Sequence, residues 1–261
     1  MLVSQAKQKE LELKKAHSGQ YLLQHILGEH VLKNQRQHGG WDGYIHPSSL
    51  DWNKSPEAQV NSLRKTWQPS VDSLLRMEVG NLIHDKIQSV LIKDFFESHQ
   101  TEEHLSDDKI LFRGTPDQIG THKTLGSFIL EYKSVASYQR DKSNADRKIK
   151  KLGDLGELHD DVYNSLCIKY QDYKEPKSDH LTQLFTYIWI LAYLKKEIPK
   201  HAGVVYIRKD NMNTMEFWYK VSENKDLIVK AKDNYQKVYN LVLKDPEAIK
   251  IREANKKKYG K

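Results

Sequence analysis

Gly114–Asp117 (GTPD) and Phe128–Lys133 (FILEYK) are the two most informative segments of this chain. The second segment is an apolar run that ends with Glu131 and Lys133. Residues two apart on a β-strand point to the same side of the sheet, so these two side chains would face one site. A hairpin between the segments would bring Asp117 back to that site. Two carboxylates and an ammonium group at one point suit a hard divalent cation and a phosphate.

The composition indicates a soluble globular protein. The chain has 261 residues, of which 38% are hydrophobic and 30% are charged, enough for one large domain with a core or a domain with appendages. Its longest apolar stretch, residues 184–194, is shorter than the roughly 18 residues that a membrane helix needs. Residues 1–15 are too charged for a secretory signal, so we expect no membrane partner and a cytoplasmic location.

The charge balance favours a polyanionic partner, because the net charge is +7. Basic residues gather in residues 142–151 and in the tail 252–261, although each cluster alone is typical of a solvated helix face. The single cysteine, Cys167, excludes an internal disulfide and a four-cysteine zinc or iron–sulfur site within one chain. It indicates a reducing compartment and, by default, a buried thiol.

Hydrophobic periodicity predicts the helices. The strongest pattern covers residues 70–98, and further helices are expected at residues 1–38, 179–196 and 223–243, with a basic helix or tail after the last. Ser48 or Ser49 would cap a short helix after His46-Pro47, and Ser178 or Asp179 would cap the helix at 179–196.

Strand-like runs alternate with these helices. They are predicted at residues 109–113, 117–120, 126–133, 203–208 and 215–219, with a polar connection at 99–108. This order predicts an α/β fold in which a central mixed sheet is flanked by helices. We expect one structural domain made of an N-terminal helical and loop region (1–69), a core (70–220) with a charged insertion (137–178), and a basic C-terminal helix and tail (221–261).

Two further motifs belong with the acids and the lysine. His84, in the segment Gly80–His84, lies at the edge of the apolar face of the helix at 70–98. Gln183 and Tyr187 are four residues apart and therefore share one helix face. Each motif alone has an ordinary structural explanation, such as a core-edge histidine or a buried polar pair. Their order and spacing together are much more specific.

In this order, the motifs resemble the RecB-type branch of the PD-(D/E)xK nucleases, which includes phage exonucleases and the CRISPR-associated adaptation nuclease. The likeness covers about residues 44–220, and its matching residues are Gly80 and His84, Gly114–Asp117, Glu131 with Lys133, and Gln183 with Tyr187. The resemblance implies a restriction-endonuclease-like core with extra N- and C-terminal helices. It also implies DNA as the partner, Mg²⁺ or Mn²⁺ as the cofactor, and host cytoplasm as the location if the protein is phage-encoded.

The resemblance also implies a role for each matching residue. The implied metal ligands are His84, Asp117, Glu131 and the backbone carbonyl of Tyr132. Lys133 would orient or activate the attacking water beside the two acids, Asp117 and Glu131. Gln183 and Tyr187 would contact the DNA backbone or support the site. Relatives that carry an iron–sulfur cluster use four cysteines, so the single cysteine here excludes such a cluster within one chain.

Other residues are candidates for contacts with DNA. Arg113 and the basic segment 138–151, above all Lys148 and Lys151, could follow a phosphate backbone. Aromatic side chains could stack on unpaired bases, although we expect at least half of them to pack against the domain instead. These aromatic residues are Trp41, Tyr44, Trp52 and Trp67.

The expected function is a metal-dependent DNA nuclease, most simply an exonuclease on single-stranded DNA or duplex ends in replication, recombination or repair. A structure-specific endonuclease is the alternative within enzymes. A non-catalytic DNA-binding subunit with a nuclease fold would keep the basic surface but lose the acids. A third alternative is a nuclease subunit that acts only with a protein partner in a replication or recombination complex.

Overall fold

The fold is taken from a computed structural model, which describes residues 41–64, 77–87, 98–101, 103–136, 138–140, 168–170, 173–209 and 211–259. Several sequence predictions lie outside these residues. They are the helix at 1–38, the buried thiol of Cys167, the stacking of Trp67, and the DNA contacts of Lys148 and Lys151.

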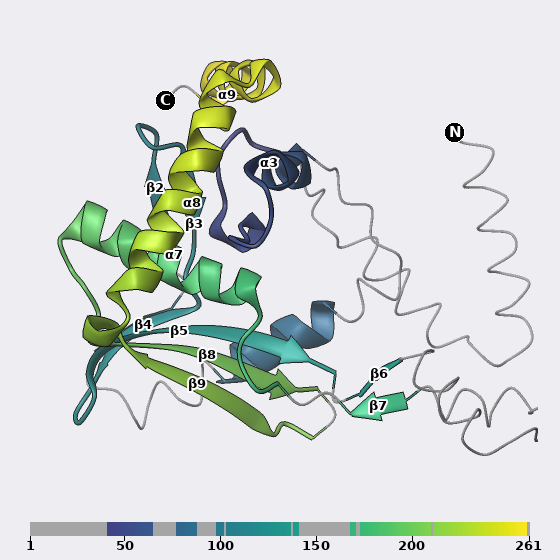
Figure 1. Cartoon of the computed structure of the whole chain (residues 1–261), viewed down its shortest axis with the longest axis vertical. Helices are drawn as coiled ribbons and strands as arrows, with labels where there is room; N and C mark the ends of the chain where they lie inside the picture. The colour runs from purple at the N-terminus through teal and green to yellow at the C-terminus, as the bar shows by residue number, and fades with distance from the viewer. Residues whose placement is uncertain are drawn as a thin grey trace, which may run out of the picture.

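A five-stranded mixed sheet forms the centre of the fold, as the sequence predicted (Figure 1). Its strand order is β1 (Ser98–Thr101), β4 (Gln118–His122), β5 (Gly126–Val135), β8 (His201–Arg208) and β9 (Thr214–Lys220). β5 and β8 run parallel, and the other pairs are antiparallel. β5 is continuously buried from Phe128 to Tyr132 and β8 from Ala202 to Arg208, because both faces of the sheet are covered there.

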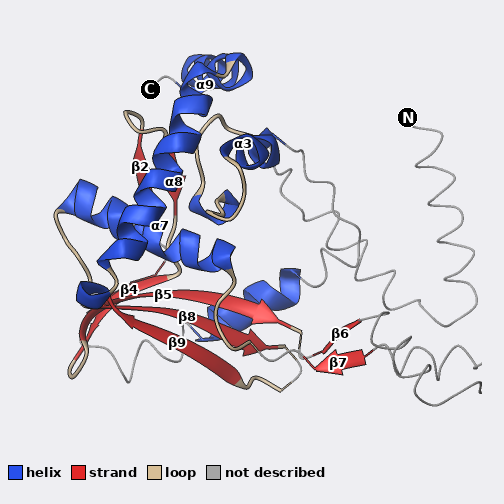
Figure 2. Cartoon of the chain, viewed as in Figure 1, coloured by secondary structure: helices blue, strands red, loops and turns tan. Residues whose placement is uncertain are grey.

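Helices cover both faces of this sheet (Figure 2). On one face, α7 (Ser178–Lys195) packs in the same core as Ile129 and Val204. On the other face, Ile83 of the helical residues 77–87 packs against Phe128, Leu130 and Tyr132. The alternation of Ile129 with Phe128 and Leu130 therefore divides β5 between two separate cores.

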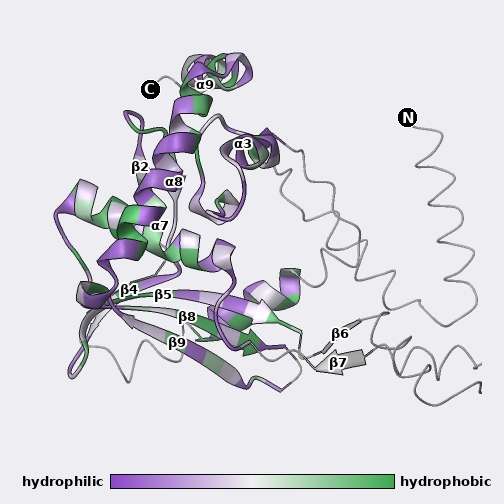
Figure 3. Cartoon of the chain, viewed as in Figure 1, coloured by the Kyte–Doolittle hydropathy of each residue, from purple (hydrophilic) through white to green (hydrophobic). Residues whose placement is uncertain are grey.

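A second layer of helices lies beyond α7. α8 (Lys225–Lys244) packs on α7 and on α3 (Pro56–Arg64), and α9 (Pro246–Tyr259) follows it. α7 is hydrophobic along most of its length, whereas α8 is hydrophilic over much of the surface in view (Figure 3). This difference follows from burial, because α7 lies between the sheet and α8 while α8 has a solvent face. No helix in the described part of the chain has the length and apolar character required to cross a membrane.

Most predicted elements are confirmed to within two residues at each end: the strands at 117–120, 126–133, 203–208 and 215–219, and the helices at 179–196 and 223–243. The strand at 109–113 is wrong in its first half. Residues 108–111 form a turn in which Leu111 has a positive φ of 54°, and β3 begins only at Phe112 and ends at Gly114. A local turn therefore replaced a run that looked strand-like by composition.

The polar connection at 99–108 is also wrong, because it contains β1 and β2 (Leu105–Asp107). β1 pairs with β4, and β2 pairs with β3. Ser98, which was assigned to the preceding helix, is the first residue of β1. The charged insertion at 137–178 contains two short strands, because β6 (Tyr138–Arg140) pairs with β7 (Ile168–Tyr170). Pairing partners elsewhere in the chain decide these strands, and local composition does not reveal them.

The predicted helix caps are wrong as well. The short helix η1 (Pro47–Ser49) has His46 at its N-cap, and α7 has Lys177, and neither cap makes a side-chain hydrogen bond. The Ser178 hydroxyl donates instead to Asp51 Oδ1, at 2.7 Å. Asp51 also accepts a hydrogen bond from the backbone N–H of Asn53, at 3.1 Å. This buried carboxylate therefore joins the loop after η1 to the start of α7.

Asp51→Ala should lower the free energy of unfolding by about 1–3 kcal/mol at pH 7, because it leaves two donors without their acceptor. Burial by itself would raise the pKa of Asp51, but the hydrogen bond from Ser178 and the contacts with Asn53 and Lys54 hold it below 3.8. A lowered carboxyl pKa stabilises the fold above the unfolded-state value, and this contribution disappears as the pH falls through the folded-state value.

Urea unfolding followed by circular dichroism at pH 7 and at about pH 3.5 measures the free energy of unfolding. The difference in this free energy between the wild-type protein and Asp51→Ala should be smaller at the acid pH. Asp233→Ala, at an exposed position on α8, is the matched control and should change little. If Asp51→Ala and Asp233→Ala lower the free energy of unfolding equally at pH 7, the role given to Asp51 is contradicted.

Candidate active site

A cleft of about 520 Å³ opens beside the ends of β3 and β5, between η1 and α7. It brings together seven of the residues that the sequence proposed for the site: His84, Arg113, Asp117, Glu131, Lys133, Gln183 and Tyr187. These side chains come from five separate parts of the chain. The fold thus places the predicted motifs around one cavity.

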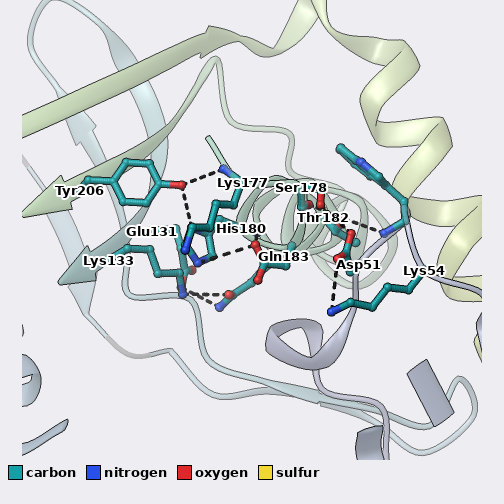
Figure 4. A network of polar contacts seen from close by, with 12 residues as sticks. Asp51, Lys54, Glu131, Lys133, Lys177, Ser178, His180, Thr182, Gln183 and Tyr206 are labelled. Carbon is teal, nitrogen blue, oxygen red and sulfur yellow. Dashed lines mark hydrogen bonds and ion pairs between the residues drawn. The ribbon is translucent and has the colours of Figure 1, made fainter. Parts of the chain in front are cut away.

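The floor of the cleft is a set of hydrogen bonds between β5 and α7 (Figure 4). Lys133 Nζ lies 2.6 Å from Glu131 Oε1, and it also donates to Gln183 Oε1 at 2.9 Å. Gln183 Nε2 donates to the same Glu131 oxygen at 2.6 Å. Three polar groups therefore close a triangle, and the expected common orientation of Glu131 and Lys133 is confirmed.

Asp117 enters the site through the hairpin of β4 and β5. The register pairs Gln118 with Leu130, which sets Asp117 opposite Glu131 just before β4 begins. Asp117 Oδ2 accepts a hydrogen bond from the backbone N–H of Tyr132 at 2.7 Å. The hairpin predicted from the sequence is confirmed, and it places two carboxylates at one end of the sheet.

The pKa values of Glu131 and Lys133 are both shifted from their ordinary values. Burial, followed by the negative charge of Asp117, raises the pKa of Glu131 to about 8, although Lys133 opposes the shift. Burial disfavours the charged form of Lys133, but the charges of Glu131 and Asp117 outweigh it and raise the pKa of Lys133. Glu131 Oε2 is buried and has no hydrogen-bond partner among the described residues. At pH 7 the raised pKa favours the protonated form of Glu131, and a cation bound beside it would favour the charged carboxylate.

A divalent cation would fit the two carboxylates, because Mg²⁺ prefers oxygen ligands and Glu131 Oε2 has no hydrogen-bond partner among the described residues. Within the described ranges, no group of three His, Cys, Asp or Glu side chains is positioned to hold a metal ion. Asp117 and Glu131 both line the cleft and are the candidate ligands there.

His84 and Tyr132 are the remaining implied ligands. His84 lines the cleft, and its ring meets the Tyr132 ring edge-on with centroids 6.2 Å apart. Burial lowers the pKa of His84, which favours a neutral imidazole. The Tyr132 side chain lies in the second core and donates its hydroxyl to Gln118 Oε1. Its phenol therefore faces away from the cleft.

Tyr187 fixes the GTPD segment against α7. Its hydroxyl accepts a hydrogen bond from the Thr115 N–H at 3.1 Å and donates to the Thr115 carbonyl at 3.0 Å. Gly114 allows this close approach, because a Cβ there would lie 2.9 Å from Tyr187 Cε1 and 2.9 Å from Pro47 Cδ. Tyr187 thus acts in this structure as a support for the turn that leads to Asp117.

The wall of the cleft around Arg113 contains Asp42 and His46, which the sequence did not identify as site residues. His46 Nε2 lies 3.0 Å from Asp42 Oδ1, and Arg113 Nη1 lies 3.3 Å from Asp42 Oδ2. Burial would raise the pKa of Asp42, but the hydrogen bond to His46 and the charge of Arg113 leave it lowered. The Arg113 guanidinium also lies over the Tyr44 ring, 3.6 Å from its centroid. No periodic pattern marks Asp42, so only the fold reveals its position.

The aromatic residues proposed for base stacking mostly pack within the fold. Tyr44 is buried in the main core, and Trp41 and Trp52 pack against that core. Trp41 Nε1 also donates to the Tyr44 carbonyl at 2.7 Å. The expectation that at least half of these residues pack against the domain is confirmed.

No family model matches this sequence, and no curated protein matches it. Among solved structures, the chain is similar to SSO0001, with 16% identity and a TM-score of 0.38 over 82% of this chain and 84% of that one. It is also similar to the alkaline exonuclease LHK-Exo from Laribacter hongkongensis, with 12% identity and a TM-score of 0.39 over 82% of this chain and 95% of that one. TM-scores at this level do not assign the chain to a family.

Tyr187→Phe should lower the free energy of unfolding by about 1–3 kcal/mol, because the backbone N–H and carbonyl of Thr115 both lose their partner. Urea unfolding measures the loss. Tyr193→Phe on the same helix is the control, since Tyr193 is 40% exposed. A Tyr187 variant as stable as the Tyr193 variant would show that the hydroxyl does not secure the turn.

Proposed function

We propose that this protein is a metal-dependent nuclease that hydrolyses phosphodiester bonds in DNA. The observation that carries the proposal is the cluster of Asp117, Lys133 and the buried Glu131 on the lining of an open cleft. The raised pKa of the Glu131 carboxyl group and its buried oxygen without a partner among the described residues are typical of sites that bind a cation or perform chemistry. The net charge of +7 supports an anionic polymer as the substrate.

In this proposal, Asp117 and Glu131 would hold Mg²⁺ or Mn²⁺, and His84, which lines the same cleft, would be the third side-chain ligand. When bound, the cation would supply Lewis-acid stabilisation of the negative charge on the phosphate. Lys133 Nζ donates to a nonbridging phosphate oxygen, which suits its compact point charge. Gln183 holds the side chains of Lys133 and Glu131 in position through one hydrogen bond to each.

The DNA would enter between this floor and the wall that carries Arg113. A guanidinium is well suited to phosphate oxygens because its N–H donors form a planar fork. We propose an exonuclease that acts on single-stranded DNA or duplex ends during replication, recombination or repair. The finer assignment to the RecB-type branch of PD-(D/E)xK nucleases rests on the order of the sequence motifs.

A non-catalytic DNA-binding protein is the second candidate. It is favoured by the incomplete set of metal ligands in the described part of the chain. A lysine that is largely buried between two carboxylates argues for catalysis, because a binding surface needs no such arrangement. Cleavage assays separate these two candidates directly.

Digestion of end-labelled linear DNA with Mg²⁺ or Mn²⁺ should release nucleotides, and EDTA should stop the release. Asp117→Asn, Glu131→Gln and Lys133→Met should each lower the cleavage rate by at least about a hundredfold, because each removes charge at the reacting phosphate. Lys232→Met, at an exposed position on α8, removes a positive charge far from the cleft and should leave the rate unchanged. Full activity in any of the three site variants would remove that residue from the mechanism.

Circular single-stranded DNA distinguishes the two modes of cleavage. An exonuclease that needs an end should leave circles intact while it degrades the linear form of the same sequence. Rapid cutting of circles would support the structure-specific endonuclease. Binding of DNA without any cleavage under all three metal conditions would support the non-catalytic candidate.

Mn²⁺ or Ca²⁺ should raise the melting temperature of the wild-type protein relative to EDTA. A cation that binds only the folded state stabilises it by about 2.7 kcal/mol at a concentration a hundred times its Kd. Glu131→Gln and Asp117→Asn should lose most of this increase, whereas Asp233→Asn, an exposed acid on α8, should keep it. An unchanged increase in both site variants would place the cation elsewhere. Differential scanning fluorimetry provides the measurement.

A further inference from the structure

The turn at Trp41–Tyr44 is held in a conformation that few residues can adopt. Gly43 has a φ of +84°, which favours glycine, and the Tyr44 N–H donates to Asp42 Oδ1 at 3.0 Å. This turn directs the Asp42 carboxylate toward the cleft, where Asp42 is a lining residue. The geometry of the turn therefore determines where one wall of the cleft lies.

The C-terminal helix α9 binds this turn through side chains that do not line the cleft. Arg252 Nη1 donates to the Gly43 carbonyl at 2.8 Å, and Asn255 Nδ2 donates to the Asp42 carbonyl at 3.3 Å. The contact is close, because a Cβ at Gly43 would lie 2.7 Å from Arg252 Cγ and 3.0 Å from the Ala248 carbonyl oxygen. Two consecutive carbonyls of the turn thus depend on one helix.

α9 is itself firmly attached to the fold. Asp245 accepts hydrogen bonds from the backbone N–H groups of Glu247 and Ala248, at 2.9 and 3.4 Å, and thereby caps the helix. The same carboxylate is paired with Arg64 of α3. Ala248 is fully buried against the main core. The helix that holds the turn therefore has a fixed position relative to the sheet.

The turn also fixes the position of Arg113, because Arg113 pairs with Asp42 of the turn. Asp42 bonds Arg113 on one carboxylate oxygen and His46 on the other, and the Tyr44 ring supports the guanidinium. The Tyr44 hydroxyl in turn donates to Asp108 Oδ1 at 2.8 Å. The contact with Asp42 uses Nη1 of Arg113, and a guanidinium has five N–H donors, so a phosphate oxygen can be bound at the same time.

We propose that Arg252 of α9 is a positioning residue for the DNA-binding wall of the cleft and acts through the Asp42–Gly43 turn on Arg113. Arg252 does not reach the cleft, and it sets how tightly the substrate is bound rather than how fast the bond is cleaved. The proposal rests on the proposed function, since it takes DNA as the ligand of Arg113. It gives a function to a helix that lies outside the region of resemblance.

The test is the binding of a fluorescein-labelled single-stranded oligonucleotide by the full-length protein in EDTA, measured by anisotropy. Arg252→Ala should weaken binding by about fivefold or more, as expected when a charge-assisted phosphate contact is misplaced. Lys250→Ala is the matched control, because it removes the same charge from an exposed position on the same helix. It should change the Kd by less than about twofold, the effect of a distant screened charge.

A double-mutant cycle separates positioning from general loss of structure. If Arg252 acts through Arg113, then Arg252→Ala should have little further effect in the Arg113→Ala background. In cleavage assays, Arg252→Ala should raise KM and leave kcat unchanged. If Arg252→Ala lowers the melting temperature too far for assay, Asn255→Ala removes only the weaker of the two contacts and should show a smaller change in the same direction.

Equal Kd values for the Arg252 and Lys250 variants would overturn the proposal, and so would additive effects of Arg252→Ala and Arg113→Ala. Either result would leave the proposed nuclease function standing, because the wild-type protein would still bind DNA. Failure of the wild-type protein to bind the oligonucleotide would overturn both. The binding assay in EDTA contains no cleavage step, so an inactive but binding-competent protein would still support the role of Arg252.

Discussion

The shared hydrogen bonding of Glu131 Oε1 with Lys133 and Gln183 is the interaction on which the arrangement of the site depends. Burying a charged pair costs several kcal/mol of desolvation, and the attraction offsets this only when the geometry is good and the remaining polar atoms are satisfied. The side-chain amide of Gln183 can make its hydrogen bonds to Lys133 and Glu131 only if α7 is held at a fixed distance from β5. Two contacts hold the part of α7 that carries Gln183 in place: Ser178 bonds Asp51 on one side of it, and Tyr187 bonds Thr115 on the other.

The same cluster is not fully satisfied, and this points to its purpose. Glu131 Oε2 has no partner in the described part of the chain, and the pKa of Glu131 is raised to about 8 because burial and Asp117 both disfavour its charge. A core selected only for stability would replace such a carboxylate, since an apolar residue of similar volume is often neutral or stabilising there. Natural sequences tolerate this kind of conflict mainly at functional sites. The cost in stability therefore supports a ligand with positive charge at this point.

The sequence predicted the parts of the fold that are encoded by local pattern. The apolar runs of β5 and β8 and the long apolar helix α7 appear where their periodicity placed them, and so does the hairpin that returns Asp117. The two-residue alternation of a strand was enough to pair Glu131 with Lys133. These features depend on residues close together in the chain, so one sequence contains the information for them.

The features that the sequence did not reveal depend on partners far away in the chain. β1 is a polar strand that exists because β4 offers it a hydrogen-bonding edge, and Ser178 bonds Asp51 instead of capping its own helix. Asp42 has no periodic signal, and its importance appears only when Arg113 is found beside it. In each case, the local preference was overridden by a tertiary contact, which composition and spacing cannot encode.

The wall of the cleft shows how far this dependence extends. Arg113 is useful to a phosphate only if Asp42 holds it at the right point, and Asp42 is held there by a turn whose glycine has a positive φ. Arg252, which lies 209 residues further along the chain than Gly43, holds this turn in place. A cleft floor built from local motifs is therefore matched with a wall built from both ends of the described chain. Because the floor and the wall are supported by different elements, the proposed function predicts that DNA binding and cleavage can be altered separately by substitution.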